Sequence, residues 1–298
     1  MFADDTTGLG KGKNLGLLTA YVNGELQKIS NWLRSNKMAI NTSKTKFIIF
    51  RTRGKRVAAD ECILVYNDNE IGMPEDPNLI FPISRIHNDG EETSFKLLGV
   101  LFDEYLSFDA HINHLCTKIS KSLFCLNRVK NFVTNNALKS LYFAMVHSHI
   151  MYCINIYGCA NATTLNKLVI KQKEAIRVVS HAKYRDHTNP LFKNLGILPL
   201  HDLIKYSALK FMHNFKHTRL PFSFNEVWIT NRARNPDINL RNADDFHVQA
   251  QNFASLKRLP LFNLPRIWNE DNNINKLNPS SNIYLRSIKS ALLNALAV

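Results

Sequence analysis

The sequence lacks the patterns of membrane, secreted and zinc-binding proteins. It has no run of eighteen apolar residues that could cross a membrane, and its first residues show neither the basic lead nor the apolar stretch of a secretory signal. Its five cysteines are an odd number for 298 residues, and neither a CxxC pair nor a zinc-knuckle spacing occurs. We therefore expect an intracellular protein with reduced thiols and no membrane partner, in either the nucleus or the cytoplasm.

Acidic residues are also scarce relative to basic ones. Lys and Arg total 38 against 24 Asp and Glu, which gives a formal net charge of +14. Such an excess favours a polyanionic partner, with nucleic acid as the first candidate and an anionic membrane surface as the second. Charge that serves solubility alone is the remaining alternative. The hydrophobic fraction of 45% is enough for an ordinary packed core.

Common nucleotide and metal motifs are missing. The glycines of GLGKGK satisfy neither the GxGxxG nor the GxxxxGK[ST] spacing, so this stretch indicates a turn. Histidines and cysteines recur at 111–116 and 147–159, but residues two apart on a helix point to different sides. We expect those side chains to pack within helices rather than to bind zinc.

In the first third, apolar spacing predicts one helix and several short strands. The helix should span Asn14–Lys37, with Asn14 as its N-cap and Trp32 on its buried face. Lys46–Phe50 indicates a strand within a basic cluster at 44–56. Residues 57–94 favour loop with β-hairpin fragments, and Phe95–Phe102 favours one strand or two strand ends joined at Gly99.

The remainder predicts mainly helices. Helical periodicity covers 111–130, 135–157 and 163–181, then about 201–216 and the C-terminus from about Asn282. The apolar residues expected on the inner faces of the first and third helices are Ile112, Leu115, Ile119, Leu123 and Leu126, and Leu165, Leu168, Ile176 and Val179. The segment 222–281 is polar and Asn-rich, with weak signals for order.

The opening stretch MFADDTTGLG contains the most unusual acidic feature, the adjacent Asp4 and Asp5. Two neighbouring carboxylates repel each other unless a cation or water screens them. On a tight turn they can present oxygen atoms to Mg²⁺, a hard cation that prefers such ligands. The simpler alternative for the dipeptide alone is a solvated turn.

Several motifs in order give the dipeptide a context. FADDTTGL is followed by a helix, then by NWLRSNKMAINTSKTKFIIF, FKLLGVLFDEYLSFDAHI and LPRIWN. This succession resembles the reverse transcriptases of non-LTR retrotransposons, in which an aromatic-Ala-Asp-Asp turn carries catalytic metal ligands. The resemblance extends over most of the chain.

The resemblance implies an α+β fold. A partial polymerase palm, made of a β-hairpin, a helix and short strands, should precede a mainly α-helical thumb-like and C-terminal region. We expect four parts: a palm remnant with the Asp-Asp turn (1–56), a loop or insertion with the LGV strand-turn (57–107), a helical thumb-like region (108–187) and a partly helical, partly irregular C-terminal region (188–298).

The resemblance also implies the site. The reaction would be RNA-templated DNA synthesis by two-metal nucleotidyl transfer, with Mg²⁺ as cofactor and an RNA template and DNA primer as partners. The expected residues are Asp4 and Asp5 as catalytic metal ligands, Lys44 and Lys46 near the nucleotide phosphates, Leu98, Gly99 and Val100 as the primer-positioning turn, and Lys167, Lys171, Lys173 and Arg177 along the nucleic-acid backbone.

One part of the family pattern is not found. The fingers and the upstream palm carboxylate would precede residue 1, so we expect the chain alone to be catalytically incomplete. Asp103 and Asp109 do not replace that carboxylate, because the family has the aspartate after L-G-V anyway. The alternatives are a basic nucleic-acid-binding protein without chemistry and a functionless mobile-element remnant.

Overall fold

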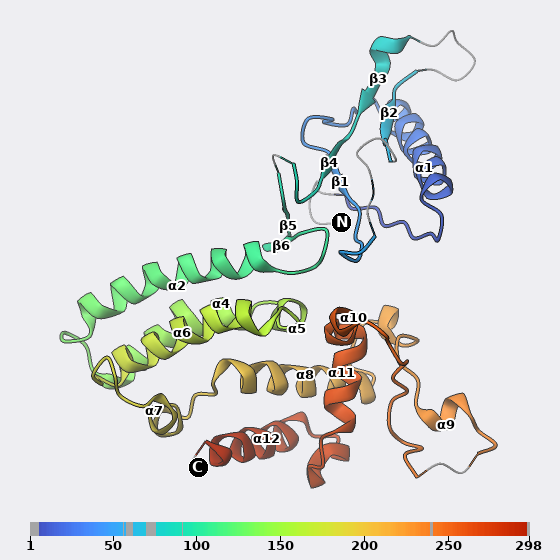
Figure 1. The fold of residues 1–298 in the computed structure, drawn as a ribbon. Coiled ribbons are helices and arrows are strands. Elements are labelled where there is room, and N and C mark those ends of the chain that lie inside the picture. Colours follow the sequence, from blue (N-terminus) through green and yellow to red (C-terminus); the bar gives the residue numbers. More distant parts are fainter. Residues whose placement is uncertain are drawn as a thin grey trace. The chain divides into compact units, whose positions relative to one another are not determined.

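The computed structural model describes residues 6–55, 57, 62–69, 76–90, 92–238 and 241–296. The chain divides into two compact units, Met1–Ser107 and Phe108–Val298. The described residues combine many helices with small sheets, which is compatible with the α+β class expected from the sequence (Figure 1). No described helix has both the length and the apolar character needed to cross a bilayer.

The first unit contains one long helix and three two-stranded sheets among its described residues. Strand β1 pairs in parallel with β4, whereas β2–β3 and β5–β6 are antiparallel. The elements are α1 (Leu15–Ser35), β1 (Lys46–Ile48), β2 (Val65–Asn67), the 3₁₀ turn η1 (Pro77–Leu79), β3 (Ile80–Pro82), β4 (Ser84–Ile86), β5 (Phe95–Leu97) and β6 (Val100–Phe102).

Helix α1 begins where the sequence predicts. The Oδ1 atom of Asn14 accepts a hydrogen bond from the amide of Leu17 at 3.1 Å, so Asn14 is the N-cap. The helix packs its Leu15, Val22, Leu26 and Leu33 against a small core around Tyr66. The prediction for Trp32 is wrong, because this side chain is 60% exposed. Its position, one residue before Leu33, turns it about 100° away from the packed face.

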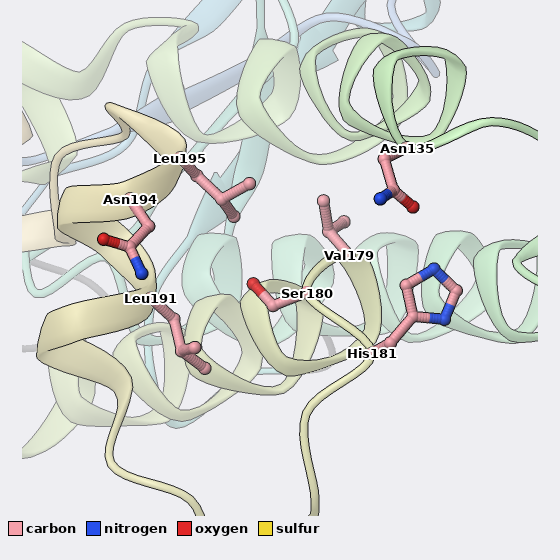
Figure 2. Close-up of a pocket in the computed structure, with 7 residues that line it drawn as sticks. All are labelled: Asn135, Val179, Ser180, His181, Leu191, Asn194 and Leu195. Atoms are coloured by element: carbon pink, nitrogen blue, oxygen red, sulfur yellow. The ribbon is translucent and has the colours of Figure 1, made fainter.

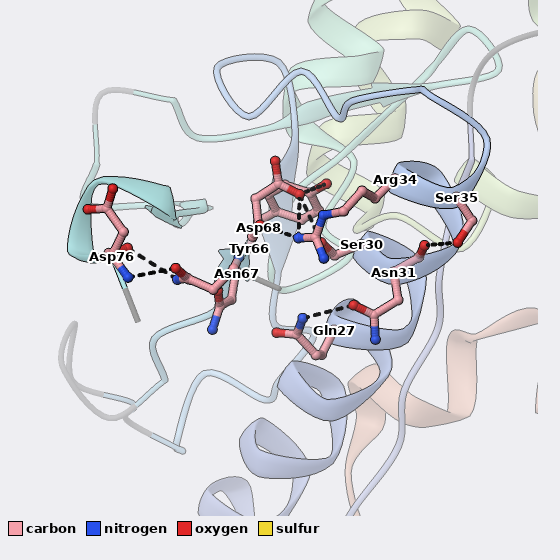
Figure 3. Close-up of polar contacts among 10 residues, drawn as sticks. Gln27, Ser30, Asn31, Arg34, Ser35, Tyr66, Asn67, Asp68 and Asp76 are labelled. Atoms are coloured by element: carbon pink, nitrogen blue, oxygen red, sulfur yellow. Dashed lines mark hydrogen bonds and ion pairs between the residues drawn. The ribbon is translucent and has the colours of Figure 1, made fainter. Parts of the chain in front are cut away.

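Asp68, which directly follows β2, forms hydrogen bonds with two side chains of α1 (Figure 3). Its Oδ1 atom accepts hydrogen bonds from the hydroxyl of Ser30 at 3.2 Å and from Arg34 at 3.0 Å. Both donors lie on α1 one turn apart, so a single carboxylate fixes the rotation of the helix. Polar contacts therefore supplement the small apolar core of this unit.

The second unit is helical in its described residues. Its elements are α2 (Asp109–Val129), α3 (Asn135–Tyr142), the π-helical turn η2 (Phe143–His147), α4 (Ser148–Met151), α5 (Ile154–Tyr157), α6 (Ala162–Val179), α7 (Thr188–Leu195), α8 (Leu200–Lys216), the 3₁₀ turn η3 (Phe222–Phe224), α9 (Asn231–Arg234), α10 (Ala254–Arg258), α11 (Pro260–Asn269), the 3₁₀ turn η4 (Ile274–Leu277) and α12 (Ser281–Ala295). Helix α2 lies against α6, and α8 contacts both α11 and α12 (Figure 1).

The predicted inner faces of α2 and α6 are confirmed. All five apolar positions expected on α2 are buried, and so are the four expected on α6: Ile112, Leu115, Ile119, Leu123 and Leu126, with Leu165, Leu168, Ile176 and Val179. Each series advances by three or four residues, which keeps the side chains on one face of the helix. These two helices form the best-predicted part of the fold.

The prediction of one continuous helix over 135–157 is wrong. The chain widens into the π-helical turn η2 and then breaks at Cys153, whose φ of 54° is left-handed. A π-helical turn shifts backbone carbonyls away from their α-helical partners. The hydroxyl of Ser122 on α2 donates to one of them, the carbonyl of Met145, at 2.9 Å. Tertiary contacts thus compensate for an irregularity that periodicity does not predict.

The weak order expected over 222–281 is also wrong for its described residues. Trp228, Phe246, Leu264 and Trp268 are buried there and pack against α8 and α12. The indole Nε1 of Trp228 donates to the carbonyl of Leu261 at 2.7 Å. Few but large aromatic side chains build this core, and a polar average composition conceals them.

Burial of His111 on α2 makes the second unit sensitive to acid. Its ring lies 5.1 Å from that of Tyr157, and burial, with smaller effects of His114 and Lys118, lowers the pKa of His111 to about 4. The unfolded chain binds this proton below about pH 6.5, whereas the folded chain resists it down to about pH 4. Stability should therefore fall as the pH drops from about 6.5 to 4, by up to about 3 kcal/mol from this residue.

The measurement is urea unfolding at pH 7 and pH 4.5, followed by tryptophan fluorescence. In a Trp32→Phe background the remaining tryptophans, Trp228 and Trp268, both belong to the second unit. Replacing His111 by Phe in this background should flatten the pH dependence. An equally steep dependence in the His111→Phe protein would contradict the prediction.

Candidate nucleic-acid interface

The predicted metal ligands Asp4 and Asp5 lie outside the described residues. Among the residues that are described, no three His, Cys, Asp or Glu side chains gather as a metal site would require. The zinc alternatives at 111–116 and 147–159 thus gain no support there.

Lys44 and Lys46 flank the start of β1. The turn before the strand is held by Asn41, whose side-chain oxygen accepts from the amide of Lys44 at 3.2 Å. The Lys44 side chain is exposed, whereas the ammonium of Lys46 forms an ion pair with Glu92. Lys44 is therefore the more available of the two for a phosphate.

The basic cluster at 44–56 is partly neutralised by an acid far along the sequence. Arg51 makes a two-pronged ion pair with Glu104, with Nε–Oε2 and Nη2–Oε1 distances of 2.9 and 3.0 Å. The Glu104 side chain is fully buried and that of Arg51 is 9% exposed. Arg85 lies 3.9 Å from the same carboxylate.

The pKa of Glu104 reflects these contacts. Burial alone would raise it, but hydrogen bonds from Arg51, the Asn88 amide and Tyr105 outweigh burial and hold the pKa of Glu104 below its usual range. Arg51 thus ties the residues after β1 to those after β6. It is a structural residue rather than a free cation, whereas Lys44, Arg53 and Lys55 of the same cluster are exposed.

The LGV motif forms a tight hairpin. Leu97 pairs with Val100, so Leu98 and Gly99 are the two turn residues, with φ values of 45° and 86°. Two positive φ values are typical of a type I′ turn, which usually contains Asn-Gly. Leu98 is an unusual residue for this conformation, and its side chain is 56% exposed. Strain of this kind at an exposed tip is more common at functional positions than elsewhere.

Asp103 follows the hairpin, and its carboxylate forms hydrogen bonds within the turn that it begins. Its carboxylate accepts hydrogen bonds from the amides of Tyr105 and Ser107 and from the Ser107 hydroxyl, all between 3.0 and 3.1 Å. Asp109 accepts from the hydroxyl of Thr164 on α6. Both carboxylates thus take part in hydrogen bonds within the fold.

The four residues of α6 that are predicted to contact the nucleic-acid backbone differ in their surroundings. Lys167 is exposed, and its ammonium reaches Asn113 at 3.0 Å, whereas Lys171 pairs with Glu174 at 2.9 Å. Lys173 is half-buried. Arg177 donates its Nε–H to the carbonyl of Asp186 at 3.1 Å. Part of its guanidinium group therefore binds the loop that follows the helix.

Two Drosophila proteins are similar to this chain. An RNA-directed DNA polymerase from mobile element jockey of Drosophila melanogaster is 24% identical over 215 residues, which cover 71% of this chain and 21% of that protein. The jockey polymerase of Drosophila funebris is 31% identical over 121 residues, 39% of this chain and 13% of that protein. These similarities support a reverse transcriptase of the non-LTR retrotransposon type.

The match is partial in several respects. The matched segments span about a fifth and about an eighth of the two jockey polymerases. No family model matches the chain. No solved structure matches it either. The similarity therefore supports a family resemblance and does not place palm or thumb on the fold.

The excess of positive over negative charge lies in one unit. Residues 108–298 contain 25 Lys and Arg but only 10 Asp and Glu, whereas residues 1–107 contain 13 and 14. The second unit thus has a net charge of +15 and the first a net charge of −1. A total of +14 conceals this separation, which becomes visible once the boundary between the units is known.

The sequence analysis also missed the loop between α6 and α7. This loop reads HAKYRDH and contains Tyr184, whose side chain is 81% exposed between Lys183 and Arg185. In a sequence, an aromatic residue between two basic residues is a weak signal of a binding site, since many such triplets are buried in part. Exposure of the ring is what makes it a candidate contact.

Proposed function

We propose that this chain is part of a retrotransposon-type RNA-directed DNA polymerase, and that residues 108–298 hold the template–primer duplex. The single observation that carries the binding role is the net charge of +15 in this unit beside a nearly neutral first unit. Phosphate contacts provide most of the affinity for nucleic acid and do not depend on sequence. The similarity to the jockey polymerases supports the choice of an RNA template and a DNA primer.

The first unit would then contribute the residues that act where the primer is extended. Asp4 and Asp5 would hold Mg²⁺, which would activate the primer hydroxyl and neutralise charge on the departing pyrophosphate. Lys44 would contact the nucleotide phosphates, with Lys46 available only if its pair with Glu92 opens. The strained Leu98-Gly99 tip, with Val100, would position the primer end.

Binding without chemistry is the second candidate, and it predicts the same interface. The two are separated by the substitution of Asp4 and Asp5 considered in the Discussion. The interface itself is tested by the salt dependence of affinity for an RNA–DNA hybrid duplex. Four cations on α6 that each neutralise one phosphate would lower the affinity about a hundredfold between 50 and 200 mM salt.

Matched charge removals locate the contact. Replacing Lys167, Lys171 and Lys173 by Gln should make the dependence of log affinity on log salt shallower by about 3. The control replaces three exposed lysines of α8 and α12, Lys205, Lys210 and Lys289, and removes the same charge. Equal changes in both variants would show that α6 has no special role, and no binding of the parent chain at low salt would refute the proposed function.

A further inference from the structure

The loop between α6 and α7 is a fixed turn rather than a loose connection. The Asp186 amide donates to the carbonyl of Lys183 at 3.1 Å, and the Asp186 carboxylate accepts from the amide of Lys183 at 2.7 Å. Arg177 of α6 holds the carbonyl of Asp186 at 3.1 Å. Tyr184 and Arg185 are the two central residues, so the turn presents them to solvent in a defined place.

The start of this loop is also fixed. Helix α6 ends with two backbone hydrogen bonds, from His181 to Val178 at 3.3 Å and from Ala182 to Arg177 at 3.0 Å. This is the Schellman arrangement, which requires positive φ at His181, here 52°. Ala182, the last residue of this ending, directly precedes the 183–186 turn, so little freedom remains between them.

A surface pocket lies beside the loop. It has a volume of about 250 Å³ and is lined by the start of α3, the end of α6 and α7. In Figure 2, Asn135 and His181 face Leu191, Asn194 and Leu195 across a common space, with Val179 and Ser180 between them. A lining that combines aliphatic side chains with the amide groups of Asn135 and Asn194 suits a flat, polar-edged molecule such as a nucleobase.

The charges around this loop favour a phosphate-bearing ligand. From Arg177 to Lys193 the sequence has four basic residues and one acid, Asp186. The carboxylate of Asp186 is already used within the turn. The ring of Tyr184 is 81% exposed and flanked by Lys183 and Arg185, which are exposed as well.

We infer that the α6–α7 turn and the pocket beside it bind unpaired nucleotides of a single strand. Tyr184 stacks on one base, Lys183 and Arg185 contact the adjoining phosphates, and the pocket receives a neighbouring base whose edge meets Asn194. His181 lines the pocket three residues before Tyr184, so their Cα atoms are at most about 11 Å apart. Aromatic stacking of this kind tolerates any base and needs an unpaired one.

This inference rests on the proposed function, because it assigns a single-stranded segment to the unit that holds the duplex. It also makes a separate statement. The duplex is held by phosphate contacts alone, whereas the turn requires exposed base faces. A base-paired hybrid without overhang offers no such face, so the two modes of binding can be measured apart.

The test compares two probes at one low salt concentration, a single-stranded oligouridylate and a blunt RNA–DNA hybrid hairpin. Replacing Tyr184 by Ala should weaken binding of the single strand about five- to a hundredfold and leave the hairpin within about twofold. Tyr184→Phe keeps a ring and should behave as the parent. Phe222→Ala removes a similarly exposed aromatic side chain, 87% exposed, far along the sequence and should change neither probe.

Two further measurements test the role of the pocket and the role of the base. Asn194 is exposed, so Asn194→Leu should fold normally, remove the amide and reduce single-strand affinity without affecting the hairpin. An abasic strand of equal length should bind the parent no better than oligouridylate binds Tyr184→Ala. Thermal melting of each variant confirms that it is folded.

The outcomes separate the inference from the proposed function. A parent chain that binds neither probe refutes both. A parent that binds the hairpin, with oligouridylate affinity unchanged in Tyr184→Ala, overturns only the stacking role. Unchanged single-strand affinity in Asn194→Leu removes the pocket from the site.

Discussion

Primer extension is expected to fall at least about a thousandfold when either Asp4 or Asp5 is replaced by Asn. Asparagine keeps the size and shape of aspartate but loses the negative charge with which the proposed site would hold Mg²⁺. A bound metal ion contributes several kcal/mol of transition-state stabilisation, and about 4 kcal/mol corresponds to a thousandfold in rate. The loss should appear in the rate of nucleotide addition rather than in affinity for the hybrid, which depends on the second unit.

The measurement uses a chimaera in which this chain replaces the matching segment of a jockey polymerase. The chimaera should extend a DNA primer on an RNA template in a Mg²⁺-dependent manner. Glu25→Gln is the control, because the Glu25 side chain on α1 is 41% exposed and pairs with Lys28 in the next turn. Full extension by the Asp4→Asn or Asp5→Asn protein would exclude a metal role and leave binding without chemistry.

Replacing Glu104 by Ala is expected to destabilise the first unit by about 3–5 kcal/mol. The substitution leaves the guanidinium of Arg51, only 9% exposed, without its two-pronged partner. Removing one member of a buried ion pair is strongly destabilising, since the other charge stays buried without compensation. The same change removes an acceptor for the Asn88 amide and for Tyr105, as the lowered pKa of Glu104 indicates.

The measurement is hydrogen exchange in peptides of residues 6–107, with the peptides of 108–238 as an internal reference. Protection should be lost in the first unit only. Glu25→Ala removes an exposed pair and should cost less than about 1 kcal/mol. The double variant Arg51→Met with Glu104→Leu should be more stable than Glu104→Ala, because no charge is then left buried. Equal loss in the double variant would contradict this account.

The sequence predicts the regular helices well and the irregular connections poorly. The faces of α2 and α6 follow directly from apolar spacing, and Asn14 signals the start of α1. For the 95–102 run the sequence leaves open one strand or two strand ends joined at Gly99, and the structure has the second arrangement, β5 and β6. In each case the decisive interaction is local, so the sequence contains it.

Long-range contacts account for the failures. The π-helical turn depends on Ser122, which is 23 residues away from its acceptor, Met145. The neutralisation of Arg51 depends on Glu104, 53 residues further along. The order of 222–281 depends on Trp228 and Trp268, which belong to one apolar cluster with residues of α8 and α12. The palm and thumb assignments and the roles of the candidate site residues remain predictions.

The uneven distribution of charge has a consequence for how the chain would withstand heat. A polyanion that binds only the second unit adds to the stability of that unit alone, by about 2.7 kcal/mol when its free concentration is a hundred times its dissociation constant. The first unit, with a net charge of −1, gains nothing from the same ligand. Heparin or RNA would therefore separate the melting transitions of the two units. The first unit, which contains the Arg51–Glu104 pair, would melt at the lower temperature.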